Sequence, residues 1–243
     1  AAQVNEMVRP LVRMLIKLVA ACPDEMATLL YNIVGIMSAH YGELGMSWML
    51  SIPADYMTSK QWGDLYEPLP FNDVPDDAWY RADLVNTWER GLINGTGAGT
   101  FTPDGVVTRA QVVTVLYRMA GSPSVAGKTC PFTDNTASWS RDAIIWAYST
   151  GVAKGYTDTI FAGSDSVTRE QLASFLYRYA DKIVSGGTLK APISYADSFA
   201  DAATVSDYAV PAMRWANQNG IITGKPGGLL DPLGGATRAE FAV

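Results

Sequence analysis

Three arginines stand in the same short motif, each directly after a threonine that has Gln or Glu three positions further on. The pairs are Thr108-Arg109, Thr168-Arg169 and Thr237-Arg238. Thr-x-x-Gln/Glu is a capping box, which marks the start of a helix. A helix start carries backbone N–H groups and positive partial charge, and a guanidinium beside it can hold a carboxylate through two parallel hydrogen bonds. The motif therefore predicts anion binding at three helix starts; solvated or salt-bridged arginines are the structural alternative.

Three further residue types recur once with each motif. They are the Asp of a Phe-x-Asp motif (Asp73, Asp134, Asp201), an aromatic residue (Trp79, Trp139, Tyr208) and a loop glycine (Gly95, Gly155, Gly224). An aspartate can accept hydrogen bonds from sugar hydroxyls, or instead bond a loop amide or the arginine. An aromatic ring can stack on a sugar face, but we favour a place in the core. The glycines serve mainly the chain conformation, and their loops can offer backbone amides to an anion.

The recurrence identifies an internal repeat. The segments 79–109, 139–169 and 208–238 share one register: an aromatic residue, a first glycine, a second glycine, then Phe101, Phe161 or Leu230, and finally Thr-Arg. With the upstream Phe-x-Asp motif, six landmarks occur in each of the three copies, which indicates a repeated structural unit rather than chance.

Each unit reads as helix, loop, helix. Between the aromatic residue and the first glycine, copies two and three place apolar residues at i, i+4, i+7 and i+8, which predicts a helix with one apolar face that ends at glycine. Copy one departs from this pattern and uses Leu84, Val85 and Trp88. We expect Phe101, Phe161 and Leu230 to point inward from the loop, and the capping box to start the second helix. Short helix pairs of this kind bury their apolar faces only in sets.

The combination of Phe-x-Asp, Gly-x-x-x-Gly and Thr-Arg-Ala-Glu resembles the S-layer homology repeat. Residues 237–240 carry Thr-Arg-Ala-Glu itself. The resemblance implies an all-α fold of three helix-loop-helix repeats in a pseudo-threefold arrangement, at residues 71–122, 132–184 and 199–243. The third copy is expected to be truncated, because the chain stops five residues after Arg238. Copy two also has Ala162-Gly163 where the family usually has proline.

The resemblance further implies a non-catalytic module that anchors a protein at the cell wall or S-layer of a Gram-positive-type bacterium. Its ligand would be an anionic, pyruvylated secondary cell-wall polysaccharide, bound in grooves between repeats by the arginines, aspartates, aromatic residues and glycines above. An alternative is a structural or assembly protein that uses the repeats and the N-terminal helices to hold a protein partner.

Composition excludes several other functions. The chain has 243 residues, one histidine (His40) and a net charge of −6. A site with several imidazoles is therefore impossible, and nucleic acid is an unexpected partner without a basic patch. One aspartate per repeat fits repeated binding sites better than a unique catalytic pair. We expect no enzyme activity, metal or cofactor. Cys22 and Cys130 are too distant for a CxxC motif and either pair or stay free.

The first seventy residues resemble no family that we recognise. Residues 1–50 are predicted to be a helical segment, with helices at 4–21 and 24–41, and residues 51–70 a linker. The run 4–21 contains Arg9, Pro10, Arg13 and Lys17, so it predicts neither a transmembrane helix nor a signal sequence. Seven of the nine methionines lie in this region, a soft apolar surface for packing on the repeats or on a partner protein.

Overall fold

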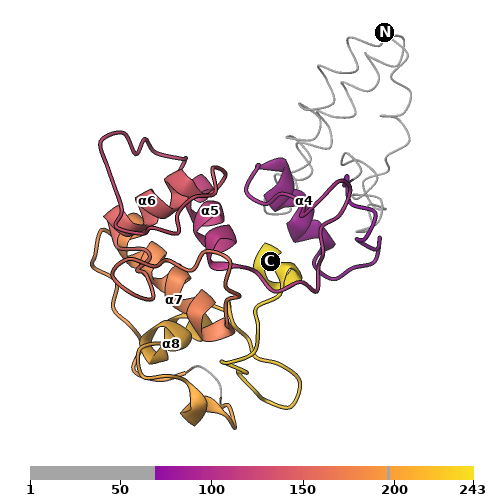
Figure 1. Cartoon of the computed structure of the whole chain (residues 1–243). Helices are drawn as coiled ribbons and strands as arrows, with labels where there is room; N and C mark the ends of the chain where they lie inside the picture. Colours follow the sequence, from indigo (N-terminus) through magenta and orange to yellow (C-terminus); the bar gives the residue numbers. More distant parts are fainter. Residues whose placement is uncertain (1–68, 196–197) are drawn as a thin grey trace, which may run out of the picture. The chain divides into compact units, whose positions relative to one another are not determined.

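The structure is a computed structural model that describes residues 69–195 and 198–243. The chain divides into two compact units, residues 1–70 with 75–82 and residues 71–74 with 83–243. The second unit, which we call the repeat unit, holds most of the described residues (Figure 1). The predicted N-terminal helices, the linker up to residue 68, His40 and Cys22 lie outside the described residues, as does the protein interface expected there.

Each repeat contributes two α-helices in the order predicted. The first repeat has α4 (Arg81–Glu89) and α5 (Arg109–Met119), the second α6 (Arg141–Thr150) and α7 (Arg169–Tyr179), and the third α8 (Val210–Gln218) and α9 (Arg238–Ala242). A π-helical turn, Ala180–Val184, continues α7, and a 3-10 turn, Ala202–Thr204, precedes α8. The described residues form isolated β-bridges but no strands, so the all-α prediction is confirmed.

The local signals in the sequence mark the helix ends correctly. Thr108, Thr168 and Thr237 each form a complete capping box, with the hydroxyl accepting from the backbone of the third helical residue and that residue's side chain accepting from the threonine N–H. The first helices are followed by a glycine with positive φ, which a residue with Cβ adopts only under strain. These glycines are Gly91, Gly151 and Gly220, with φ of 67°, 77° and 69°.

A closed cycle of backbone hydrogen bonds joins the three repeats. Val107 N–H donates to the carbonyl of Ala236, Ala236 N–H donates to Val167, and Val167 N–H donates to Val107, at 2.9, 3.0 and 2.9 Å. All three residues are buried and directly precede a capping threonine. Equivalent positions of the three repeats therefore meet around a common centre, which is the predicted pseudo-threefold arrangement.

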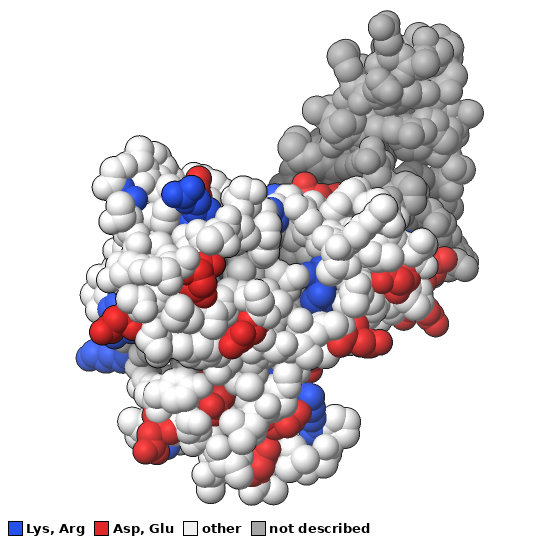
Figure 2. All heavy atoms as spheres, viewed as in Figure 1, with Lys and Arg blue, Asp and Glu red and all other residues white. Residues whose placement is uncertain are grey.

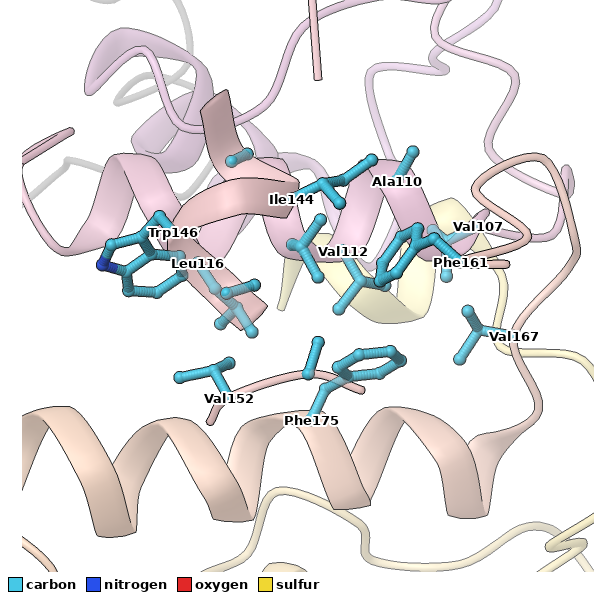
Figure 3. Packing of buried hydrophobic residues seen from close by; sticks show 14 of the residues in the cluster. Val107, Ala110, Val112, Leu116, Ile144, Trp146, Val152, Phe161, Val167 and Phe175 are labelled. Atoms are coloured by element: carbon cyan, nitrogen blue, oxygen red, sulfur yellow. The ribbon is translucent and has the colours of Figure 1, made fainter. Parts of the chain in front are cut away.

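The core lies where the second helices meet the loops. Phe101, Phe161 and Leu230 are at most 1% exposed, so the predicted inward direction of these loop residues is confirmed. In Figure 3, Phe161 and Phe175 lie beside Val112 and Val167, in the cluster that joins the first two repeats. The helix α5 packs against α6 and α7, and α7 packs against α8 (Figure 1).

The first helix of each repeat buries the apolar face predicted for it, except at the aromatic residue with which the repeat register begins. Ala143, Trp146 and Ala147 are buried in α6, and in the atypical first repeat Leu84 and Val85 are buried. The expected core position of Trp79, Trp139 and Tyr208 is wrong, because all three rings are exposed. The helices α4, α6 and α8 begin two residues after these rings, so none of the rings lies on the buried face of its helix.

Among the described residues, no helix combines the length and apolarity needed to cross a membrane.

Candidate functional site

The arginines of the Thr-Arg motifs lie inside the boundaries between repeats. Arg109, Arg169 and Arg238, the boundary arginines, are only 5–7% exposed. Each reaches from the second helix of one repeat to the loop of the next, where its Nε donates to the carbonyl of the buried loop residue. The acceptors are Phe161 for Arg109, Leu230 for Arg169 and Phe101 for Arg238, at 2.9, 3.0 and 2.6 Å. The three contacts run in a cycle, so every boundary contains one boundary arginine.

A second contact differs from one boundary arginine to the next. Arg109 donates to the carbonyl of Lys154 at 2.8 Å, and Arg238 to that of Asn94 at 2.7 Å. Arg169 instead forms an ion pair with Glu240 at 2.9 Å. Burial lowers the pKa values of Arg109 and Arg238, although a guanidinium stays charged throughout the physiological range.

The backbone amides at the three helix starts are occupied by protein. In α5, the N–H groups of Arg109 and Ala110 donate to carbonyls of Asp165 and Gly163 in the next repeat. The other two helix starts repeat this pattern. In α7 the N–H groups of Arg169 and Glu170 donate to the carbonyls of Gly234 and Pro232, and in α9 those of Arg238 and Ala239 donate to the carbonyls of Gly105 and Pro103. The third amide bonds the capping threonine. The expectation of free N–H groups for an anion is therefore wrong: these amides bind neighbouring loops.

The aspartates of the Phe-x-Asp motifs also bind loop amides. Asp73 accepts from Phe101 and Thr102, Asp134 from Phe161 and Ala162, and Asp201 from Leu230 and Asp231, all at 2.7–2.9 Å. Of the roles left open for these residues, the bond to a loop amide is the one that the structure contains. Desolvation raises the pKa of each carboxyl, but the two amide hydrogen bonds outweigh it and the pKa lies below its ordinary value.

These aspartates fix a strained turn. The residue after each buried loop residue has positive φ although it carries a side chain: 58° at Thr102, 59° at Ala162 and 50° at Asp231. Such a conformation costs free energy and persists only where its surroundings hold it. Because the N–H of each strained residue donates to the aspartate, the carboxylate supplies that support and shapes the loop at each boundary.

The second glycines leave room for the phenylalanine of the same motif. A Cβ on Gly95, Gly155 or Gly224 would lie 2.7, 2.5 or 2.7 Å from the Cε1 of Phe71, Phe132 or Phe199. Phe71 and Phe132 in turn pack on the rings of Phe101 and Phe161, with centroids 5.6 and 5.4 Å apart. The glycines therefore permit a close approach between ring and backbone, the conformational role expected for them.

The leading aromatic residues form the exposed part of the predicted site. Trp79, Trp139 and Tyr208 are 67%, 57% and 53% exposed. The Tyr208 hydroxyl donates to Glu170 at 2.9 Å, and Glu170 also accepts from the N–H and hydroxyl of Ser206. Burial and the bond to this carboxylate raise the pKa of Tyr208 to about 12. Acidic and basic side chains are scattered over the face shown in Figure 2, and neither sign forms a continuous patch there.

Sequence reasoning missed Tyr156. The ring centroid of Tyr156 lies 4.2 Å from the Arg109 Cζ, in cation–π contact. The repeat register contained a signal for it, because Tyr156 directly follows the second glycine of its copy. Cys130, also within the described part, is a free thiol.

Three helix-loop-helix repeats, closed into a cycle by backbone bonds and boundary arginines, define a repeat module with exposed aromatic residues. The chain belongs to the S-layer homology domain family, whose model matches residues 70–113, 131–173 and 198–242. These matches cover more than half of the chain.

Similar proteins act at bacterial surfaces or carry the same repeats beside other domains. The chain is 31% identical over 173 residues to an endoglucanase of Bacillus sp. (strain KSM-635), covering 71% of this chain and 18% of that protein. It is 29% identical to the S-layer protein sap of Bacillus anthracis, covering 44% and 13%, and 27% identical to a cellulosome-anchoring protein of Acetivibrio thermocellus, covering 52% and 30%. The chain thus spans a minor part of each relative's length. The family and its surface relatives place the chain at the bacterial cell wall or cell surface.

Proposed function

We propose that this chain is a non-catalytic module that anchors a protein to the cell wall by binding an anionic, pyruvylated secondary cell-wall polysaccharide at the boundaries between repeats. The family and the cellulosome-anchoring relative support the anchoring role. We propose in addition that the glycan is acidic, as the family resemblance implies, and that residues of the repeats contact it.

One observation carries the proposal: a large aromatic ring stands exposed at the same register in every repeat. Trp139 is 57% and Tyr208 53% exposed, and each precedes the first helix of its repeat. Burying such a ring on folding would stabilise the protein, so three exposed rings at one register are costly unless they bind something. The flat apolar face of an indole or phenol suits the C–H face of a sugar ring.

The boundary arginines and the aspartates have a supporting role in this proposal. Arg109, Arg169 and Arg238 hold adjacent repeats together, and Asp73, Asp134 and Asp201 hold the strained turn of each loop. Gly95, Gly155 and Gly224 let the loop lie against a phenylalanine ring. Direct contact of these arginines, aspartates and glycines with the glycan stays a prediction. It would involve only the atoms of these residues that remain accessible beside their protein partners.

Co-sedimentation with cell walls tests the proposal. The purified chain is incubated with native Gram-positive walls and with the same walls after mild acid treatment, which removes pyruvyl ketals. We expect the chain to pellet with native walls and to stay in the supernatant with treated walls. Equal pelleting with both would contradict recognition of the pyruvyl group, and no pelleting with either would contradict glycan binding.

An aromatic variant links this binding to the exposed rings. Trp139→Ala removes a half-exposed ring and should weaken pelleting about tenfold without lowering the melting temperature. The guide to this magnitude is the stacking of a nucleic-acid base on an aromatic side chain, which contributes about 1–3 kcal/mol per base. Tyr148→Ala, in the same repeat, removes a ring that is 42% exposed but lies outside the recurring register, and should leave pelleting unchanged. Equal effects of the two variants would refute the assignment.

A further inference from the structure

The sequence contains two Asn-Gly steps, Asn94-Gly95 and Asn219-Gly220. Asparagine is one of the chemically labile residues, because the backbone nitrogen of the next residue can attack its side-chain carbonyl carbon. A glycine in the next position favours this attack, since no Cβ shields the nitrogen. Both asparagines are exposed to water, so their reactivity depends on the contacts that each one makes.

Hydrogen bonds protect Asn219. The N–H of Gly220 donates to the carbonyl of Asn217 at 3.0 Å. The side-chain amide of Asn219 donates to the carbonyl of Trp215 at 2.8 Å. The nitrogen that would attack and the amide that would be attacked are therefore both held at the end of α8, and these bonds must break before the two groups can react.

Asn94 has the opposite arrangement. Among the described residues, the N–H of Gly95 makes no hydrogen bond. The side-chain oxygen of Asn94 accepts from Arg118 at 3.2 Å when the amide is oriented so that both of its polar atoms are bonded. The backbone carbonyl of Asn94 accepts from Arg238 at 2.7 Å. Both carbonyl groups of this residue therefore bind a guanidinium, and the neighbouring nitrogen is free.

The two arginines act where charge develops during attack. When the Gly95 nitrogen loses its proton and bonds to the side-chain carbon of Asn94, negative charge builds up on the oxygen that Arg118 contacts. A positioned cationic donor stabilises such a charge. The amide nitrogen then leaves as ammonia, and a succinimide ring remains that contains both carbonyls. Water opens this ring, so that overall an amide and water become a carboxylate and ammonium.

The reactive step belongs to the first repeat alone. The loop needs a glycine at this position in every repeat because a phenylalanine ring lies against it. The residue before the glycine is free to vary, and the equivalent steps in the other repeats are Lys154-Gly155 and Thr223-Gly224. Neither lysine nor threonine has a side-chain carbonyl, so these two steps cannot form the ring.

We propose that Asn94 is a site of spontaneous deamidation, promoted by Arg118 at its side-chain carbonyl and by Arg238 at its backbone carbonyl. Ring opening at the side-chain carbonyl gives aspartate, whose carboxylate pairs with Arg118. Ring opening at the backbone carbonyl gives isoaspartate, which adds a methylene group to the backbone directly before Gly95. Because Gly95 is closely packed, the lengthened chain disturbs the loop that receives Arg238 and weakens this boundary between repeats.

Ageing of the purified full chain at mildly alkaline pH tests this assignment. Samples taken over time are digested with trypsin under mildly acidic conditions, and mass spectrometry follows peptide 91–109, which contains Asn94, and peptide 215–238, which contains Asn219. We expect Asn94 to deamidate at least about tenfold faster than Asn219 in the folded chain. In urea the two rates should be similar, because both asparagines precede glycine.

Variants separate the effect of the cation from that of loop flexibility. Arg118→Gln should slow the deamidation of Asn94 by at least about threefold, because the donor at the developing charge is lost. Arg118→Lys, which keeps a cation without the planar fork, should react at an intermediate rate. Arg141→Gln removes an exposed arginine of α6 and should leave the rate unchanged. If Arg118→Gln merely loosened the loop, the reaction would become faster.

Each result supports or overturns the proposal, and none depends on glycan binding. Deamidation of Asn94 no faster than that of Asn219 in the folded chain would overturn it, as would an unchanged or faster rate in Arg118→Gln. Ion exchange of the aged chain separates the aspartate and isoaspartate forms. The isoaspartate form should melt about 2–4 °C below the unaged chain, and equal melting temperatures would overturn the predicted weakening of the boundary.

Discussion

Replacing Arg238 by alanine should open the cycle of repeats. Arg238 donates to the carbonyls of Phe101 and Asn94 at 2.6 and 2.7 Å, and its Cζ lies 4.5 Å from the Phe101 ring centroid. These contacts join positions 137 and 144 residues apart in the chain. Arg238→Ala removes both hydrogen bonds and leaves two carbonyls at the boundary without their donors.

The expected loss of stability follows from these contacts. An acceptor left unsatisfied costs about 1–3 kcal/mol, and a cation–π contact contributes about 0.5–1 kcal/mol. Part of this loss of stability is offset, because the variant no longer buries a charged guanidinium. We expect the free energy of unfolding to fall by about 3 kcal/mol, which for a unit of this size corresponds to a melting temperature about 6–12 °C lower.

Circular dichroism during heating measures this change. The matched control is Arg141→Ala, which removes an arginine at the first position of α6 that is exposed; its effect should stay within about 0.5 kcal/mol. Arg238→Lys should fall between the two, since an ammonium lacks the planar fork. A difference of about 2 °C between the melting temperatures of two variants corresponds to about 0.5–1 kcal/mol for a unit of this size. If Arg238→Ala and Arg141→Ala melt within about that interval of each other, the boundary arginines do not hold the repeats together.

Two other substitutions test the packing and electrostatics of the loops. Gly155→Ala places a Cβ against the carbonyl oxygens of Thr157 and Ile160 and against the Phe132 ring, and should lower the free energy of unfolding by about 1–3 kcal/mol. The control is Gly97→Ala, whose Cβ meets only a threonine hydroxyl at 3.1 Å; an equal loss for both variants in chemical denaturation would contradict this packing argument. The folded-state pKa of Asp134 lies below its unfolded value, so its contribution to stability is complete above about pH 4 and is lost as the pH falls through the folded pKa. Asp134→Asn should therefore flatten the acid limb of the melting temperature plotted against pH, whereas the exposed Asp158→Asn should not; identical acid limbs would contradict the role of the carboxylate.

Local motifs predicted the features that depend on neighbouring residues. The capping boxes at Thr108, Thr168 and Thr237 and the glycines after the first helices need only a few consecutive residues, and all are found where expected. The repeat register also predicted the buried loop residues, because a single large apolar residue in a polar loop has few alternatives to pointing inward.

Features that depend on distant parts of the chain could not be predicted in the same way. The boundary arginines point inward because they donate to carbonyls that lie between 45 and 144 residues away in the chain. Carbonyls of the loops also accept the hydrogen bonds of the first backbone amides of the second helices. The exposure of Trp139 follows from a helix that begins two residues later than the ring, a shift too small for periodicity to detect.

Titration of the chain with soluble secondary cell-wall polysaccharide measures directly whether this module recognises an acidic glycan. The dissociation constant is measured for the purified polysaccharide before and after removal of its pyruvyl ketals, at one fixed salt concentration. We expect saturable binding of the native polysaccharide and an affinity at least tenfold weaker after the pyruvate is removed. Equal affinity for both forms would contradict recognition of an acidic glycan by this module.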